Sequence, residues 1–173
     1  MRFRGFVYRA HHPRWAFSPL SGEGAARYGG RFNPTGMPAL YTARRMQTAW
    51  AEAQQAFPFK AQPMTLCAYE VDCADVADLT DPAVVASLGV TREVLACPWE
   101  DLASRRQTPP SWDLARRLQA AGIAAIMVPS FAAGATAEDV NLVFWQWSPT
   151  PPHSVTVIDD EGRLPRDDRS WQG

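Results

Sequence analysis

Two apolar stretches decide the fold class of this chain: Ile123-Ala-Ala-Ile-Met-Val128 and Leu142-Val-Phe-Trp-Gln-Trp147. A strand with one solvated face alternates apolar and polar residues, whereas a continuous apolar run predicts a strand that is buried on both faces. We therefore expect both stretches to be central strands of a sheet that is covered on both sides. The same apolar setting makes Trp145 and Trp147 core residues rather than a stacking platform for nucleobases.

Further strands are predicted on either side of this pair, at residues 3–9, 39–42, 64–71 and 154–158. Between residues 46 and 58 apolar side chains recur at helical spacing, which predicts an amphipathic helix. The residues of its apolar face are Met46, Ala49, Trp50, Ala53 and Phe57. Thr80 is expected to cap a short helix that ends at Gly89, and Ser111 a longer helix that ends at Gly122.

Strands scattered among helices of uneven length, without a regular βαβ order, predict an α+β fold with a mixed central β-sheet flanked by helices. We expect a single domain at residues 1–158, followed by a polar C-terminal tail at residues 159–173. Residues 10–37 show neither helical nor alternating periodicity. An irregular stretch of that length inside a domain is often functional.

The composition limits the classes of function. The chain has 173 residues, of which 46% are hydrophobic and 20% charged, as in a globular domain. No window reaches the roughly 18 apolar residues of a membrane helix, and the first residues do not resemble a secretory signal, so we expect a cytoplasmic location. The net charge of −1 gives no support to binding of nucleic acid or of an anionic membrane surface. Lys60 is the only lysine, and no P-loop motif is present.

The stretch from Ser21 to Gly36, SGEGAARYGGRFNPTG, carries five glycines and two arginines. Glycines allow positive φ angles and close approach to a ligand, and Arg27 and Arg31 supply planar donors suited to phosphate oxygens. This pattern indicates an anion-binding loop, and a surface loop with solvated arginines is the alternative. A dinucleotide-binding fingerprint is excluded, because Arg27 occupies its third glycine position and no strand leads into the loop.

Four more residues are candidates for a site, each with a plain structural alternative. Glu52 lies with Thr48 on the polar face of the predicted helix, where a solvated carboxylate is the alternative. Tyr41 ends a short apolar strand and is alternatively a packed aromatic residue. Ser130 follows a buried strand, where sheet proteins often place site residues but where turn serines are common. Arg9 similarly ends the first strand.

The histidines and cysteines do not form a recognisable site. His11, His12 and His153 show no His-Glu-x-x-His or Cys/His spacing, so we expect no metal. Three cysteines without a C-x-x-C pair fit reduced thiols better than a disulfide framework. A cysteine nucleophile would need a histidine beside it, and nothing in the sequence indicates one.

One set of motifs resembles a known family. Gly29-Gly30-Arg31-Phe32-Asn33-Pro34 is followed by Pro38-Ala-Leu-Tyr-Thr-Ala43, by Glu52 and, much later, by Asn141-Leu142-Val143. Together these motifs resemble the RES domain over nearly the whole chain. That family is named for an arginine, a glutamate and a serine, which correspond here to Arg31, Glu52 and Ser130.

The resemblance implies a fold similar to ADP-ribosyltransferases and the role of toxin in a bacterial toxin–antitoxin pair. Such toxins consume NAD⁺ by hydrolysis, by phosphorolysis or by passing ADP-ribose to a protein. NAD⁺ is therefore the expected substrate, and a metabolic protein is a candidate acceptor. The expected partner is a helix-turn-helix antitoxin of the Xre type, and neither direct nucleic-acid binding nor membrane binding is expected.

The resemblance also implies roles for the candidate residues. Glu52 would stabilise the cationic ribose that forms when the nicotinamide–ribose bond breaks. Arg31 and Arg9 would bind the pyrophosphate, Tyr41 would orient the nicotinamide ribose, and Ser130 would hydrogen-bond the sugar or the carboxamide. Two readings from other classes stay open: a ribonuclease toxin, which the net charge disfavours, and a non-catalytic nucleotide-binding module.

Overall fold

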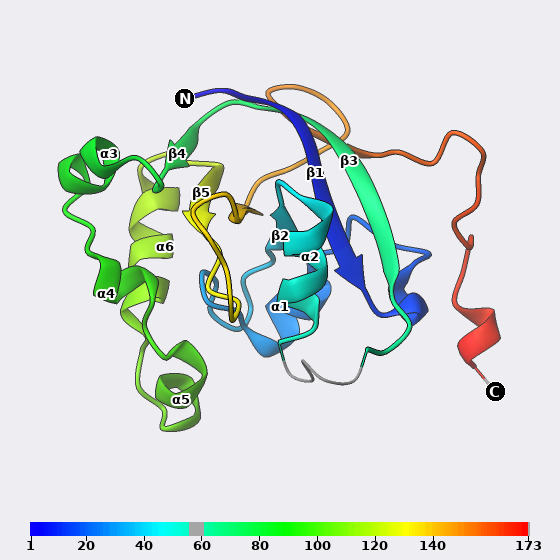
Figure 1. The fold of residues 1–173 in the computed structure, drawn as a ribbon, viewed down its shortest axis with the longest axis horizontal. Coiled ribbons are helices and arrows are strands. Elements are labelled where there is room, and N and C mark those ends of the chain that lie inside the picture. The colour runs from blue at the N-terminus through cyan, green and yellow to red at the C-terminus, as the bar shows by residue number, and fades with distance from the viewer. Residues whose placement is uncertain (56–60, 173) are drawn as a thin grey trace.

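The computed structural model describes residues 1–55 and 61–172, and these form a seven-stranded sheet with helices packed around it (Figure 1). The strands are β1 (Phe3–His11), β2 (Leu40–Ala43), β3 (Thr65–Cys73), β4 (Val76–Asp78), β5 (Ala125–Pro129), β6 (Val140–Phe144) and β7 (His153–Val157). Their order is β4-β5-β6-β2-β1-β3-β7. Only the β4–β5 pair is parallel among the described strands, so the predicted α+β class with a mixed central sheet is confirmed.

The helices form two groups. Near β1 and β2 lie α1 (Glu23–Tyr28) and α2 (Met46–Ala53). Around β4 and β5 lie α3 (Pro82–Ser87), α4 (Arg92–Leu95), α5 (Trp99–Ser104) and α6 (Pro110–Ala120) (Figure 1). Short 3₁₀ turns cover Pro13–Trp15 and Arg169–Trp171.

The two stretches that decided the fold class are buried on both faces, as predicted. Alternate residues of β5 and β6 enter two different cores. Met127 and Leu142 pack with Val7 and Tyr69 on one face of the sheet. Ile126 and Val143 join a second core with helix α6 on the other face. Trp145 is buried in that second core, as expected for a core residue.

Two predicted helix caps and one predicted irregular stretch were wrong. Asp81, not Thr80, caps α3, because its carboxylate accepts from the backbone N–H of Ala83 at 2.8 Å. Ser111 does not cap the long helix, which begins one residue earlier at Pro110. Its buried hydroxyl instead donates to the Arg31 carbonyl at 2.5 Å. Residues 10–37, predicted to be irregular, contain the end of β1, a 3₁₀ turn and helix α1.

The predicted apolar face of α2 was right at Ala49 and wrong at Met46, Trp50 and Ala53. Met46 and Trp50 are 49% and 39% exposed, whereas Thr48 and Ala49 are buried. The helix therefore packs against β1, β2 and β6 partly through the face expected to be solvated. Thr48 and Ala49 are small enough to let α2 approach the strand ends closely. This close approach places Glu52 at the inner side of the helix. Phe57, the last residue assigned to that face, lies outside the described residues.

The residues after β7 remain attached to the domain. Leu164 packs against the core that contains Val7 and Tyr69. The Trp171 ring contacts the His12 ring edge-on, with ring centroids 5.2 Å apart. Among the described residues, no helix has the length and apolar character required to cross a membrane.

Candidate active site

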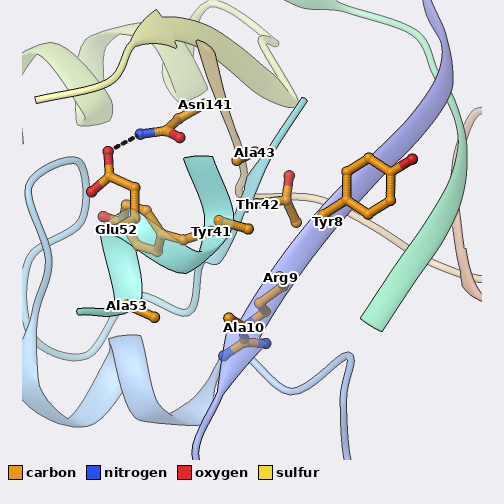
Figure 2. A pocket seen from close by; sticks show the side chains of 10 residues that line it. Tyr8, Arg9, Ala10, Tyr41, Thr42, Ala43, Glu52, Ala53 and Asn141 are labelled. Carbon is orange, nitrogen blue, oxygen red and sulfur yellow. Dashed lines mark hydrogen bonds between the residues drawn. The ribbon is translucent and has the colours of Figure 1, made fainter. Parts of the chain in front are cut away.

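A cavity of about 240 Å³ opens between α2 and strands β1, β2 and β6, and we call it the carboxylate pocket (Figure 2). Its lining residues are Tyr8, Arg9, Ala10, Tyr41, Thr42, Ala43, Ala49, Glu52, Ala53 and Asn141. The β2–β6 register pairs Ala43 with Asn141. Three strands and one helix, far apart in the sequence, therefore meet at a single pocket.

The Glu52 carboxylate is held at the wall of this pocket by three donors. Its Oε1 atom accepts from the Ser130 hydroxyl and from the Asn141 side-chain amide, both at 2.5 Å. Its Oε2 atom accepts from the side-chain amide of Gln55, which lies just beyond the end of α2. These hydrogen bonds fix the orientation of the carboxylate. Because none of the three donors is a cation, no salt bridge among the described residues neutralises its charge.

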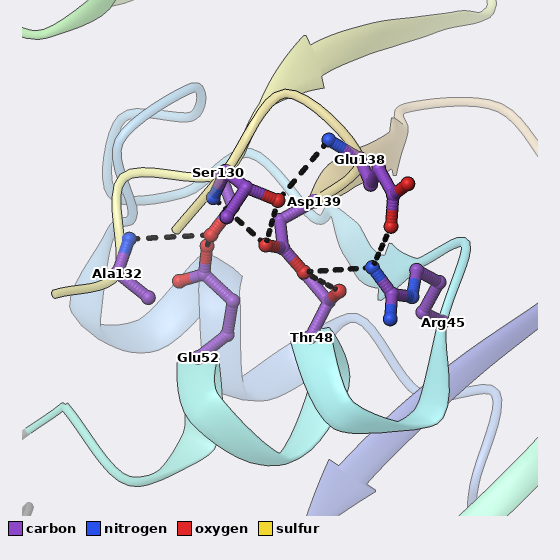
Figure 3. Close-up of polar contacts among 8 residues, drawn as sticks. Arg45, Thr48, Glu52, Ser130, Ala132, Glu138 and Asp139 are labelled. Atoms are coloured by element: carbon purple, nitrogen blue, oxygen red, sulfur yellow. Dashed lines mark hydrogen bonds and ion pairs between the residues drawn. The ribbon is translucent and has the colours of Figure 1, made fainter. Parts of the chain in front are cut away.

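A second carboxylate fixes the start of α2. Asp139 immediately precedes β6, and it accepts from the Thr48 hydroxyl at 2.6 Å and from the Thr136 backbone N–H at 2.8 Å (Figure 3). The hydrogen bond from Thr48 is the main reason why the pKa of Asp139 lies at about 2. Thr48 precedes Glu52 by one helical turn, so this contact also sets the depth at which Glu52 enters the pocket.

Tyr41 lines the carboxylate pocket with its ring and uses its hydroxyl elsewhere. The hydroxyl donates to Asn33 Oδ1 at 2.7 Å and accepts from the Phe32 backbone N–H at 2.9 Å. Burial raises the pKa of this phenol well above its usual value. A Cβ atom on Gly30 would lie 2.5 Å from the Tyr41 hydroxyl oxygen, so this contact requires glycine there.

The predicted anion-binding loop is a packed turn. Asn33 is fully buried, and its amide donates to the carbonyls of Ala25 and Met37. Arg31 Nη1 donates to the Cys97 carbonyl at 2.7 Å, and its guanidinium stacks on the Phe131 ring at 4.6 Å. Arg31 does not line the carboxylate pocket in this structure.

Arg9 lies at the boundary between the carboxylate pocket and a second, smaller pocket. Its Nη1 atom donates to the carbonyls of Pro19 and Ser21, both at 3.1 Å. Burial lowers the pKa of the guanidinium, although arginine keeps its charge in proteins. Arg9 thus brings a desolvated positive charge to the pocket that holds Glu52.

Comparison with protein families identifies the chain. The model of the RES domain matches residues 6–167, which is nearly the whole sequence. The chain belongs to the RES domain family. The family expected from the motifs is therefore confirmed.

Individual relatives of this RES domain protein were found as well. A stretch of 64 residues is 45% identical to the NAD(+) phosphorylase MbcT of Mycobacterium tuberculosis and to that of Mycobacterium bovis. That match covers 35% of this chain and 34% of each relative, so the chain spans about a third of the length of these curated relatives. A chain in the crystal structure of the M. tuberculosis MbcT-MbcA toxin–antitoxin complex has the same fold, with a TM-score of 0.64. That alignment covers 92% of this chain and 84% of the other at 23% identity.

The structure places most of the residues that the RES resemblance had singled out around one pocket. Arg9, Tyr41 and Glu52 line it, and Ser130 reaches it through its hydrogen bond to Glu52. Arg31 is not among the lining residues, and its guanidinium stacks on the Phe131 ring. No cluster of three or more potential metal ligands occurs within the described parts of the RES domain.

Asn141 was not recognised as a site residue, although its motif was. It contributes an amide donor to Glu52, and its Oδ1 atom is buried without a partner among the described residues. The available signal was a polar amide at the start of the apolar run Leu142–Trp147, on a strand otherwise buried on both faces. Such a residue needs a hydrogen-bonding reason to be there.

Proposed function

We propose that this RES domain protein is the toxin of a bacterial toxin–antitoxin pair, and that it breaks the nicotinamide–ribose bond of NAD⁺ and transfers ADP-ribose to an acceptor. The observation that carries the proposal is the Glu52 carboxylate, held by three neutral donors in a pocket that a partly buried arginine also lines. The similarity to proteins named NAD(+) phosphorylase supports the substrate and makes inorganic phosphate the first acceptor to test.

The chemistry follows from the charges at this site. When the bond between ribose C1′ and the nicotinamide nitrogen breaks, its electron pair stays with nicotinamide and positive charge develops on the ribose. The negative charge of Glu52 stabilises that cation, and fixed hydrogen bonds mean that the carboxylate does not have to reorganise during the reaction. An acceptor oxygen then bonds to C1′. With hydrogen phosphate the products are nicotinamide, ADP-ribose 1″-phosphate and a proton, and with water they are nicotinamide, ADP-ribose and a proton.

The remaining residues have distinct roles in this proposal. Arg9 binds the pyrophosphate, and the Tyr41 ring orients the nicotinamide ribose at the pocket wall. Ser130 acts through Glu52, because its hydroxyl donates a hydrogen bond to that carboxylate. Asn141 Oδ1 accepts from a hydroxyl or amide of the substrate, which satisfies a buried atom that has no partner among the described residues.

Arg31 contributes from outside the pocket wall. Within the described residues only its Nη1 atom takes part in hydrogen bonds, so its other N–H groups stay available to phosphate oxygens. The Phe131 ring on which it stacks belongs to the residue that directly follows Ser130. We therefore keep Arg31 as a second pyrophosphate ligand, as the family motif implies.

The toxin role predicts a partner and a location. An antitoxin of the helix-turn-helix Xre type would block the site in the cytoplasm, and the toxin–antitoxin complex that shares this fold supports a protein partner. Transfer to a metabolic protein is the alternative to transfer to phosphate or water. Expression of the chain alone is expected to stop bacterial growth, and co-expression of the antitoxin is expected to restore it.

Product analysis tests the proposal directly. Purified protein is incubated with NAD⁺ in buffers with and without inorganic phosphate, and in cell lysate, and the products are identified by mass spectrometry. We expect free nicotinamide in every case and ADP-ribose 1″-phosphate only where phosphate is present. Glu70→Gln, which changes an exposed carboxylate on β3, serves as a matched control and should react like the wild type. Absence of nicotinamide release together with cleavage of added RNA would replace this proposal with the ribonuclease reading.

A further inference from the structure

A second pocket adjoins the carboxylate pocket at Arg9, and we call it the histidine pocket. It has a volume of about 50 Å³ and is lined by Arg9, His11, Trp15, Ser18, Ser21, Glu23, Gly24 and Arg27. Arg9 and His11 are two residues apart on β1, so their side chains leave the strand on the same face. Arg9 lines both pockets, so the two pockets adjoin at this residue near the end of β1.

His11 is the unusual group in this second pocket. Its ring is only 9% exposed, and neither Nδ1 nor Nε2 has a hydrogen-bond partner among the described residues. Leaving a buried polar group unpaired costs about 1–3 kcal/mol, so buried polar groups in folded proteins usually have a hydrogen-bond partner. The imidazole thus faces a pocket with one unused donor and one unused acceptor.

The charge state of His11 restricts the ligand class. Burial and the positive charges of Arg9 and His12 lower its pKa to about 4, so the ring is neutral near pH 7. A neutral ring presents one N–H donor and one nitrogen lone pair, which accepts from a hydroxyl or an amine. The Glu23 carboxylate, in the same lining, has the same preference. Hydroxyls and an exocyclic amine, with a phosphate on the Arg9 side, are the groups of an adenosine monophosphate unit.

The rim of the pocket offers a surface for a flat base. Trp15 is 47% exposed although it lies beside buried residues. Stacking of a base on an aromatic ring stabilises binding by about 1–3 kcal/mol. The hydrogen bonds from Arg9 to the carbonyls of Pro19 and Ser21 hold the opposite wall in place. The pocket therefore combines a stacking surface, a neutral hydrogen-bonding ring and an adjacent guanidinium.

We infer that the histidine pocket and its rim bind the adenosine half of NAD⁺, with His11 hydrogen-bonding a polar group of the adenosine that enters the pocket and Trp15 stacking on the adenine at the rim. This inference rests on the proposed function for the identity of the substrate. It adds a binding subsite and two residues that determine specificity for a dinucleotide over a mononucleotide.

Substrate truncation tests the inference. Nicotinamide mononucleotide is NAD⁺ without its adenosine monophosphate half, so the ratio of kcat/KM for the two substrates measures the contribution of that half. We expect His11→Phe, which keeps a ring but removes both nitrogens, to lower this ratio about tenfold through KM for NAD⁺, as expected for loss of one good hydrogen bond. His11→Gln, which restores a polar side-chain end, should recover part of the ratio. His153→Phe, far from the pocket in the lining of another cavity, is the control and should leave the ratio unchanged.

Binding without turnover separates this inference from the proposed function. By calorimetry, adenosine monophosphate should bind the wild-type protein more tightly than ribose 5-phosphate does, and His11→Phe should weaken that binding about tenfold. Trp15→Ala, at an exposed position where folding is little affected, should weaken it about fivefold or more. Equal binding of the two probes, or unchanged affinity in both variants, would overturn the inference even if NAD⁺ is consumed. Adenosine monophosphate binding without any NAD⁺ consumption would support the subsite and refute the proposed reaction.

Discussion

The carboxylate pocket and the histidine pocket meet at Arg9, but they treat buried polar groups in opposite ways. In the carboxylate pocket, both oxygens of Glu52 accept hydrogen bonds from neighbouring side chains. In the histidine pocket, neither nitrogen of His11 has a partner among the described residues. A group that must meet a developing charge benefits from being held before the substrate arrives. A group that recognises a hydroxyl or an amine of the bound substrate must instead have a free donor or acceptor before the substrate arrives.

From this contrast we expect the carboxylate pocket to determine the rate of the reaction and the histidine pocket to determine the affinity for the substrate. Substitutions around Glu52 should change kcat with little effect on substrate binding, because the carboxylate acts mainly in the transition state. Substitutions around His11 should change KM and leave kcat largely alone.

The largest effect is expected for Glu52→Gln. The amide keeps the size of the side chain and one acceptor oxygen but removes the charge that stabilises the ribosyl cation. We expect kcat to fall about a hundredfold, which corresponds to about 3 kcal/mol of transition-state stabilisation, while KM for NAD⁺ and the melting temperature change little. Nicotinamide release at the wild-type rate by a folded Glu52→Gln protein would refute the mechanism. Glu70→Gln is the matched control on an exposed strand position.

The second prediction concerns pH and the unpaired histidine. Because the pKa of His11 is about 4 in the folded protein and about 6.5 in an unfolded chain, the unfolded chain binds the proton more readily. The stabilising effect of keeping the ring neutral is therefore complete above about pH 6.5 and is lost as the pH falls towards 4. We expect the free energy of unfolding to decrease by about 2 kcal/mol between pH 7 and pH 5.

Urea unfolding at the two pH values measures this change. His11→Phe should remove most of the decrease, because the variant has no group to titrate at this position. Asp72 and Asp139, whose pKa values lie at about 2, lose their stabilising effect only below about pH 4 and do not overlap with the histidine. An equally steep decrease in His11→Phe would show that the ring is not the group responsible.

The third prediction concerns Tyr41, which connects the loop at residues 21–36 to the wall of the carboxylate pocket. Tyr41→Phe removes the hydroxyl that bridges Phe32 N–H and Asn33 Oδ1, and leaves both groups without that partner. We expect a loss of about 1–2 kcal/mol in the free energy of unfolding, with the ring still lining the pocket. Tyr8→Phe is the control, because Tyr8 lines the same pocket and its hydroxyl forms no hydrogen bond within the described residues. Equal stability of the two variants would contradict the bridging role.

The sequence predicted the central sheet better than it predicted the arrangement of the candidate site. The apolar runs of β5 and β6 predicted a doubly covered sheet, because burial on both faces leaves a direct mark on composition. The orientation of α2 did not follow from its pattern. Its apolar residues Met46 and Trp50 point outward, while the hydrogen bond from Thr48 to Asp139 turns the polar face inward. A tertiary contact between residues 91 positions apart leaves no periodic signal in the sequence.

The same limit applies to the individual site residues. The family motif brought Glu52, Tyr41 and Ser130 to attention, but periodicity alone would have left Glu52 on a solvated helix face. The two orphaned groups, His11 and Asn141 Oδ1, were not predicted, because whether a polar atom is paired depends on which residues the fold places around it.

The smallest effect is expected for Ser130→Ala, which tests whether holding the carboxylate matters apart from its charge. The change removes one of three donors to Glu52, while Asn141 and Gln55 continue to orient the carboxylate. Glu52 keeps its charge, so we expect kcat to fall only about fivefold, which is near 1 kcal/mol, with KM for NAD⁺ unchanged. A serine that touched the substrate directly would instead raise KM when it is removed. Ser87→Ala is the control, because Ser87 is exposed on α3 and its hydroxyl donates only to the local Val84 carbonyl. A fall in kcat as large as that of Glu52→Gln would mean that Ser130 participates in the reaction itself, and an unchanged kcat would mean that two donors suffice to hold Glu52.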